Sequence, residues 1–137
     1  MSDAVYIIDG ARTPMGGLMG ELSTLSAVNL GEVAIRSALE KSNLSGDDID
    51  EVIMGCVLPS GLRQGPARQA AIDAGIPDSV GATTINKLCG SGMKSVMLSH
   101  DLIRAGTNQV MVAGGMESMS NAPCLLYTSP SPRDEKV

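Results

Sequence analysis

The stretch ATTINKLCGSGMKSVMLSHDLIRAGTNQVMVAGG, residues 82–115, combines strand, turn and helix signals in one continuous run. It begins with an extended, β-branched run at 82–88, passes through a glycine-spaced turn into a helical stretch from Gly90 to Ala105, and ends in an apolar run at 109–115. Gly106 is a stop signal for the helix. Two apolar strands joined by a helix are typical of a βαβ unit, in which the strands lie parallel.

The same alternation extends toward the N-terminus. Strands are predicted at 4–10 (AVYIIDG) and 51–57 (EVIMGCV), and helices at 27–42 and from Pro66 to about Ala74. The first helix has Ser26 as its expected N-cap. Its predicted apolar face consists of Leu30, Val33, Ala34 and Ala38. Because apolar strands that do not alternate are buried on both faces, we predict an α/β fold with a mainly parallel sheet covered by helices on both faces.

Composition and charge exclude several classes of protein. Of the 137 residues, 43% are hydrophobic and the net charge is −5, which argues against nucleic-acid binding. No apolar run approaches the ~18 residues that cross a bilayer. The chain begins without a basic signal or transit segment. The three cysteines have the spacing of neither a disulfide framework nor a zinc site. We therefore expect a cytoplasmic protein that binds no nucleic acid, no membrane and no metal.

Cys89 is the candidate for chemistry, because it stands where the strand at 82–88 meets the helix. A thiol in that position faces backbone N–H groups and the positive end of the helix dipole, and both favour the nucleophilic thiolate. The Cys89 N–H can itself donate to a developing oxyanion. A buried, inert cysteine in a tight turn fits the local pattern equally well.

The sequence offers Cys89 no obvious base. The single histidine, His100, lies eleven residues further along the same helix, or about 16 Å away. We expect it to be a packed, hydrogen-bonded histidine instead. Glu117 and Asp101 are carboxylates, which match a thiol poorly as bases. Cys56 lies within an apolar strand and is expected to belong to the core.

Five segments, in this order and spacing, resemble the thiolases, and among them the acetyl-CoA acetyltransferase (acetoacetyl-CoA thiolase) group. They are IDGARTPMGG at 8–17, EVIMGCVLPSG at 51–61, QGPARQAA at 64–71, INKLCGSGMKSV at 85–96 and VMVAGGMESMSNAP at 110–123. The resemblance implies that residues 1–123 form a partial thiolase N-terminal domain. This would be most of the N-terminal half of the family's fold, without its last strand.

The resemblance also implies a reaction. Cys89 would accept an acetyl group from acetyl-CoA as a thioester, and a second acetyl-CoA would condense with it to give acetoacetyl-CoA and CoA, or the reverse. Acetyl-CoA and CoA are then substrates, with no bound cofactor and no metal. The family's acid/base His and second Cys, and its CoA-binding loop, do not occur in this chain. It is therefore expected to be inactive alone, and its cofactor-binding residues are unassigned. Family members are homo-oligomers, dimers or tetramers.

Residues 124–137 break the pattern. The run LLYTSPSPRD resembles a translated sequencing adaptor, and we expect 124–137 to be a non-native or disordered tail. Two other functions stay open for the chain as written. It can be a non-catalytic α/β module that acts by dimerisation, or a redox-sensitive thiol protein in which peroxide oxidises Cys89.

Overall fold

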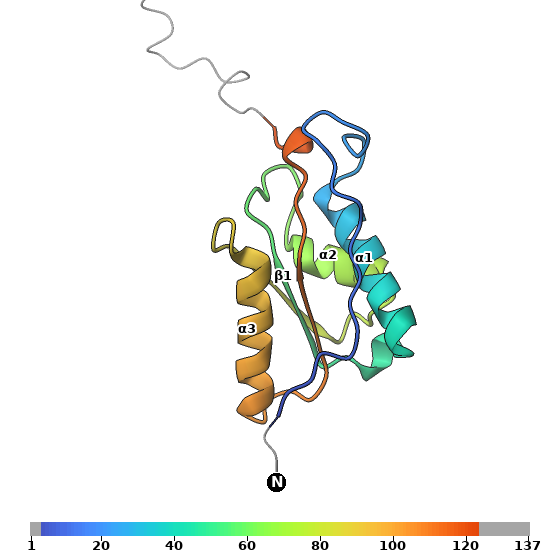
Figure 1. Ribbon diagram of the computed structural model, residues 1–137, viewed down its shortest axis with the longest axis vertical. Coiled ribbons are helices and arrows are strands. Elements are labelled where there is room, and N and C mark those ends of the chain that lie inside the picture. The colour runs from blue at the N-terminus through green and yellow to red at the C-terminus, as the bar shows by residue number, and fades with distance from the viewer. Residues whose placement is uncertain (1–3, 124–137) are drawn as a thin grey trace, which may run out of the picture.

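A computed structural model of the chain describes residues 4–123, and these form a three-layer α/β unit (Figure 1). Three parallel strands lie in the order β2-β1-β3, and the register pairs Val52 of β1 with Ala82 on one side and Val112 on the other. The elements in chain order are α1 (Ala27–Ser42), η1 (Gly46–Asp48), β1 (Glu51–Gly55), α2 (Pro66–Asp73), β2 (Gly81–Ile85), α3 (Ser91–Arg104), β3 (Met111–Gly115) and η2 (Met119–Asn121). The predicted α/β fold with a parallel sheet is confirmed.

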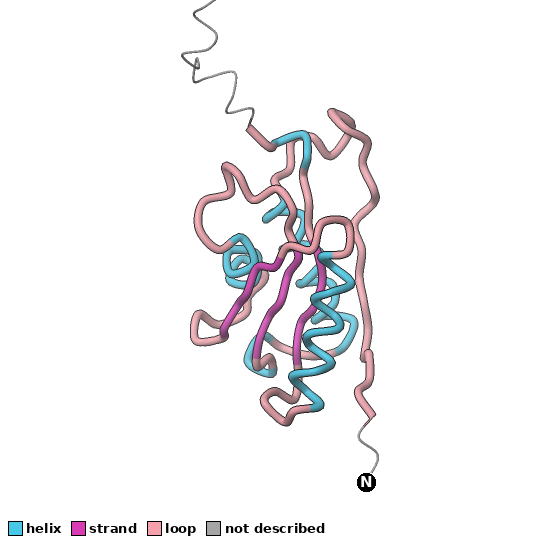
Figure 2. The backbone as a smooth tube through the Cα atoms, turned by 90° about the vertical axis from the view of Figure 1, so that its left-hand side faces the viewer, coloured by secondary structure: helices cyan, strands magenta, loops and turns pink. Residues whose placement is uncertain are grey.

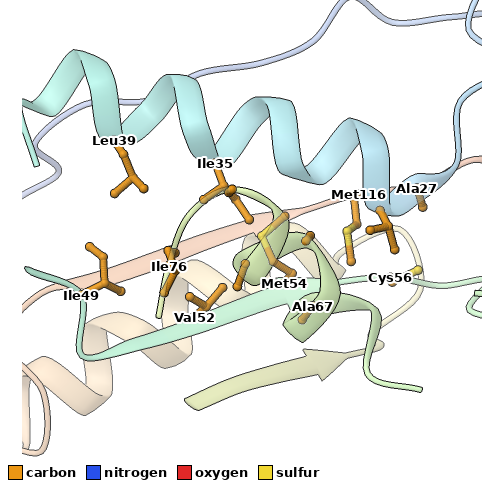
Figure 3. Close-up of a cluster of buried hydrophobic side chains, with 14 residues drawn as sticks. Ala27, Ile35, Leu39, Ile49, Val52, Met54, Cys56, Ala67, Ile76 and Met116 are labelled. Atoms are coloured by element: carbon orange, nitrogen blue, oxygen red, sulfur yellow. The ribbon is translucent and has the colours of Figure 1, made fainter. Parts of the chain in front are cut away.

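Helices cover both faces of the sheet, as predicted. α3 packs on one face against β1 and β3, while α1 and α2 lie together on the other (Figure 1). The core lies between α1, α2 and the sheet, where Ile35 and Leu39 of α1 face Val52 and Met54 of β1 (Figure 3). This core contains aliphatic side chains, methionines and small alanines, which lets the helices approach the strands closely.

The buried face of α1 differs from the predicted one. Ser26 caps the helix as expected, its hydroxyl accepting the Asn29 N–H at 3.1 Å. Val33, however, is 56% exposed. The buried residues are Ala27, Val28, Gly31, Ile35 and Leu39. The predicted residues and the buried residues are each spaced so that they share one face of the helix. Close packing at Gly31 determines which of the two faces is buried. A Cβ there would lie 3.3 Å from the Cβ of Ala70 and closer still to Met116 Sδ, so this side of α1 touches its neighbours.

Helix α3 faces the sheet with serines. Ser91, Ser95 and Ser99 are buried at intervals of four residues, whereas Met93 and Met97 point outward. The Ser95 hydroxyl lies 2.7 Å from the carbonyl oxygen of Gly114 in β3. Small side chains on both elements therefore bring the α3 backbone close to the strands.

The strand predicted at 4–10 does not form. This segment is extended and makes no strand pairing (Figure 2). The Ile7 side chain is 86% exposed. Val5 to Ala11 and β3 both line a groove of about 450 Å³, and no backbone pairing joins them. An apolar run becomes a strand only where a neighbouring backbone pairs with it, which the sequence pattern of 4–10 does not reveal. The expected tail at 124–137 lies outside the described residues.

Candidate active site

Cys89 lies in the short connection between β2 and α3, at the carboxyl edge of the sheet. β2 ends at Ile85, α3 begins at Ser91, and the Cys89 thiol is exposed. Within residues 4–123 Cys89 is therefore not the buried cysteine that the local pattern fits equally well. The first turn of α3 packs against the ends of β1 and β3, since a Cβ on Gly55 would lie 2.6 Å from Ser91 Cβ and one on Gly115 would lie 3.1 Å from Gly92 Cα. Ligands of open α/β sheets bind at this edge.

Hydrogen bonds hold the turn that carries Cys89. The Lys87 N–H donates to Ser91 Oγ at 2.8 Å, and the Ser91 hydroxyl donates to the Leu88 carbonyl at 2.6 Å. Leu88 has a φ of 50°, in the left-handed region that side chains disfavour. Two further amides stay within the turn, with Gly90 donating to Lys87 and Ser91 to Leu88.

The Cys89 amide is the exception in this turn. The Leu88 N–H donates to Asn86 Oδ1 at 2.9 Å. The backbone N–H groups of Lys87, Leu88, Gly90 and Ser91 therefore all have acceptors. Within residues 4–123, no oxygen accepts the Cys89 N–H. The thiol and an uncommitted N–H donor therefore belong to one exposed residue just before a helix N-terminus. This arrangement suits a group that must be attacked by sulfur while its oxygen gains negative charge.

A second set of hydrogen bonds joins the loops that follow the three strands. Both oxygens of the Glu117 carboxylate accept backbone N–H groups, one from Val57 and one from Leu58, each at 2.9 Å. The Val57 carbonyl accepts from Asn86 Nδ2 at 3.2 Å. Glu117 is thus a structural carboxylate and not a base for Cys89. The sequence pattern did not single out Asn86 or Ser91, although both lie close to Cys89 in the sequence.

Cys56 is a core cysteine, as predicted. Its side chain is 1% exposed, and its thiol donates to Glu117 Oε1 over 3.6 Å. Burial in the core, reinforced by the negative charge of Glu117, raises the pKa of Cys56 to about 11. Cys56 is consequently not a nucleophile at neutral pH. Cys124 lies outside the described residues.

His100 is hydrogen-bonded but not packed. Its Nδ1 lies 3.1 Å from Asp101 Oδ1, and its side chain is 54% exposed. The expectation of a packed histidine is wrong because this position faces the groove beside β3 and not the sheet. His100 is in the third turn of α3 and Cys89 precedes the first turn, so the two do not meet.

Metal ligands are not gathered anywhere in residues 4–123, where no three His, Cys, Asp or Glu side chains could hold an ion together. The expectations that no metal and no bound cofactor take part remain predictions. None of the helices in the same residues has the length and apolarity to cross a bilayer.

Known proteins share this arrangement of sequence and fold. The family described as "Thiolase, N-terminal domain" matches residues 5–135. The chain belongs to the thiolase family. The solved structure of the Acat5 thiolase from Ascaris suum in complex with coenzyme A has a TM-score of 0.84 and 44% sequence identity to this thiolase chain. The similarity covers 86% of this chain and 31% of that one.

Curated relatives of this thiolase chain are acetyl-CoA acetyltransferases. Acetyl-CoA acetyltransferase 2 of Arabidopsis thaliana is 56% identical over 119 residues, which are 87% of this chain and 30% of the relative. The mitochondrial acetyl-CoA acetyltransferase of Xenopus tropicalis is 50% identical over 128 residues, 93% of this chain and 30% of the relative. A third relative, from Gibberella zeae, is named as cytosolic and is 51% identical over 119 residues, which are 87% of this chain and 30% of the relative. The chain thus spans about 30% of the length of the curated relatives it matches.

Proposed function

We propose that Cys89 is the nucleophile of an acetyl-CoA acetyltransferase reaction, carried out by the whole protein to which this sequence corresponds in part. The observation that carries the proposal is the exposed Cys89 with its uncommitted N–H, on a turn held by Ser91 and Asn86. The relatives named above are acetyl-CoA acetyltransferases, and one thiolase structure contains coenzyme A. Acetyl-CoA and CoA are the substrates we infer.

The first half of the reaction uses residues of this chain. Cys89 Sγ attacks the carbonyl carbon of acetyl-CoA, the new carbon–sulfur bond forms, and the bond to the CoA sulfur breaks. The CoA thiolate leaves with the electron pair, and the proton that the Cys89 thiol gives up to solvent is replaced by one that the thiolate takes from solvent. The Cys89 N–H stabilises the oxyanion that exists between these events. Covalent catalysis of this kind divides one difficult acyl transfer into two easier ones.

The second half needs groups that residues 4–123 do not place near Cys89. A second acetyl-CoA must lose a proton from its methyl carbon, and the carbanion then attacks the thioester, giving acetoacetyl-CoA and freeing Cys89. The two bases that the sequence suggested are used elsewhere, since Glu117 binds backbone amides and Asp101 lies beside His100. We therefore propose that the chain alone forms the thioester but does not complete the condensation or the reverse thiolysis.

Labelling with acetyl-CoA tests the proposal. The chain is incubated with acetyl-CoA, and peptide mass spectrometry locates any acetyl group. We expect one hydroxylamine-sensitive acetyl group on Cys89, absent in Cys89→Ser and present in the matched control Cys56→Ser. Acetylation that persists in Cys89→Ser would refute the nucleophile. An unacetylated Cys89 that peroxide oxidises rapidly would favour a redox-sensitive thiol instead.

Location, assembly and the tail are further proposals. We propose a cytoplasmic, homo-oligomeric protein, dimer or tetramer. One relative is named as cytosolic, others are mitochondrial, and fractionation of cells expressing the tagged whole protein would decide. Light scattering of that protein gives its oligomeric state. We also propose that residues from Cys124 onward are not native, although the family match extends to residue 135. A genomic sequence that encodes the same residues 124–137 would overturn this proposal.

A further inference from the structure

A line of hydrogen bonds crosses the carboxyl edge of the sheet and connects the three loops that follow the strands. The peptide unit between Val57 and Leu58, which follows β1, is held from both sides. Its N–H, from Leu58, donates to Glu117 after β3, and its carbonyl, from Val57, accepts from Asn86 after β2. The line therefore follows the strand order β3-β1-β2 and ends at the turn that carries Cys89.

Asn86 uses both ends of its amide side chain. Nδ2 donates to the Val57 carbonyl at 3.2 Å, and Oδ1 accepts the Leu88 N–H at 2.9 Å. The second bond holds Leu88 at its φ of 50°, in the left-handed region that a leucine side chain disfavours and that needs support from its surroundings. Leu88 is followed directly by Cys89, so its backbone angles set where the Cys89 N–H and Sγ point.

We infer that Asn86 is a positioning residue for acyl transfer, which holds the Cys89 N–H where the oxyanion forms. This inference rests on the proposed function, because it concerns the direction of the N–H of the nucleophile. Asn86 does not touch the acyl group itself. It acts through Leu88 on one side, and it is fixed on the other by a peptide that Glu117 holds.

The test compares two reactions of the same sulfur in the 137-residue chain. p-Nitrophenyl acetate acetylates Cys89 through an oxyanion. The Sγ–carbon bond forms, the ester carbon–oxygen bond breaks, p-nitrophenolate leaves with the electron pair, and the thiol proton goes to solvent. Iodoacetamide alkylates the same sulfur by direct displacement, without an oxyanion. Both need the thiolate, so the ratio of the two rates cancels changes in thiolate fraction and in access and reports on the oxyanion donor.

We expect Asn86→Ala to lower the acylation-to-alkylation ratio by about tenfold or more, as part of the ~10²–10³-fold loss that follows removal of an oxyanion donor. Asn86→Asp keeps an acceptor for the Leu88 N–H but loses the donor to Val57, and it should fall between wild type and Asn86→Ala. Asn108→Ala is the matched control, because Asn108 Nδ2 donates to Glu51 Oε2 at 2.8 Å at the opposite edge of the sheet. Its ratio should equal that of wild type.

A ratio within twofold of wild type in both Asn86 variants would overturn the inference, as would an equal fall in Asn108→Ala. Circular dichroism shows whether Asn86→Ala folds, and if it does not, Asn86→Asp decides alone. Failure of the proposed function gives a different result, since acetyl-CoA then leaves wild-type Cys89 unlabelled whatever the ratio in the variants.

Discussion

Gly55 at the end of β1 is the position where one added methyl group should disturb both the fold and the Cys89 turn. A Cβ on Gly55 would lie 2.6 Å from the carbonyl carbon and from the Cβ of Ser91, and 2.8 Å from Gly92 N. Non-bonded carbons prefer about 3.5–4.0 Å, so the start of α3 must retreat by about 1 Å. Backbone atoms cannot rotate away from this contact as the end of a flexible side chain can.

The magnitude follows from two opposing contributions. Overpacking costs about 1–3 kcal/mol, with the upper part of the range expected where backbone is struck. Alanine in place of glycine in a strand returns about 0.5–1 kcal/mol. We therefore expect Gly55→Ala to lower the free energy of unfolding by about 2 kcal/mol, which moves a urea midpoint by about 1 M.

The matched control is Gly81→Ala, in β2. A Cβ there meets only Glu51 Cγ at 3.8 Å, an ordinary contact, so its urea midpoint should equal or exceed that of wild type. Gly55→Ala should also slow acetylation of Cys89, because the displaced Ser91 binds both Lys87 and Leu88. A Gly55→Ala chain as stable as Gly81→Ala would refute the close approach of α3 to β1.

Three other perturbations have expected outcomes. At pH 7, a thiol with a pKa of about 11 is about one part in ten thousand thiolate. Iodoacetamide should therefore alkylate Cys89 and leave Cys56 unmodified, and alkylation of native Cys56 would contradict its burial. Backbone hydrogen bonds from Val110 and Gln109 hold the pKa of Asp50 below its usual range. Its contribution to stability is therefore present above about pH 4 and lost as the pH falls through the lowered pKa. Urea midpoints of wild type and Asp50→Asn should differ at pH 7 and converge in acid, and a difference that widens in acid would reverse the sign. The exposed side chains of Ile7, Ile8 and Met93 should make the chain marginally stable or self-associating. Sedimentation velocity should show self-association at rising concentration, and a monomer with a sharp, cooperative melt would count against this expectation.

The order of elements was predictable because local signals mark each boundary. Ser26 caps α1, Pro66 begins α2, and Gly106 follows α3, and each acts through backbone rules that hold in any fold. The position of Cys89 before a helix followed in the same way, from the change of a β-branched run into a glycine-spaced turn.

Features that depend on contacts between distant segments were not predictable. The sequence of α1 contains two apolar stripes, and the contact of Gly31 with Ala70 and Met116 decides which is buried. The run at 4–10 has strand composition, but pairing depends on a neighbour that the pattern cannot show. The link from Asn86 to Val57 joins residues 29 positions apart, and it exists only because β1 and β2 pair in register.

Isotope exchange measures the acetyl transfer to Cys89 most directly. Unlabelled acetyl-CoA and radiolabelled CoA are mixed with the chain, and label appears in acetyl-CoA only if the acetyl group leaves CoA, rests on the protein and returns. We expect exchange with wild type and with Cys56→Ser, and none with Cys89→Ser. Exchange that survives in Cys89→Ser, or its absence from a wild-type chain whose Cys89 is readily alkylated, would contradict the assignment of Cys89 as the acyl-accepting nucleophile.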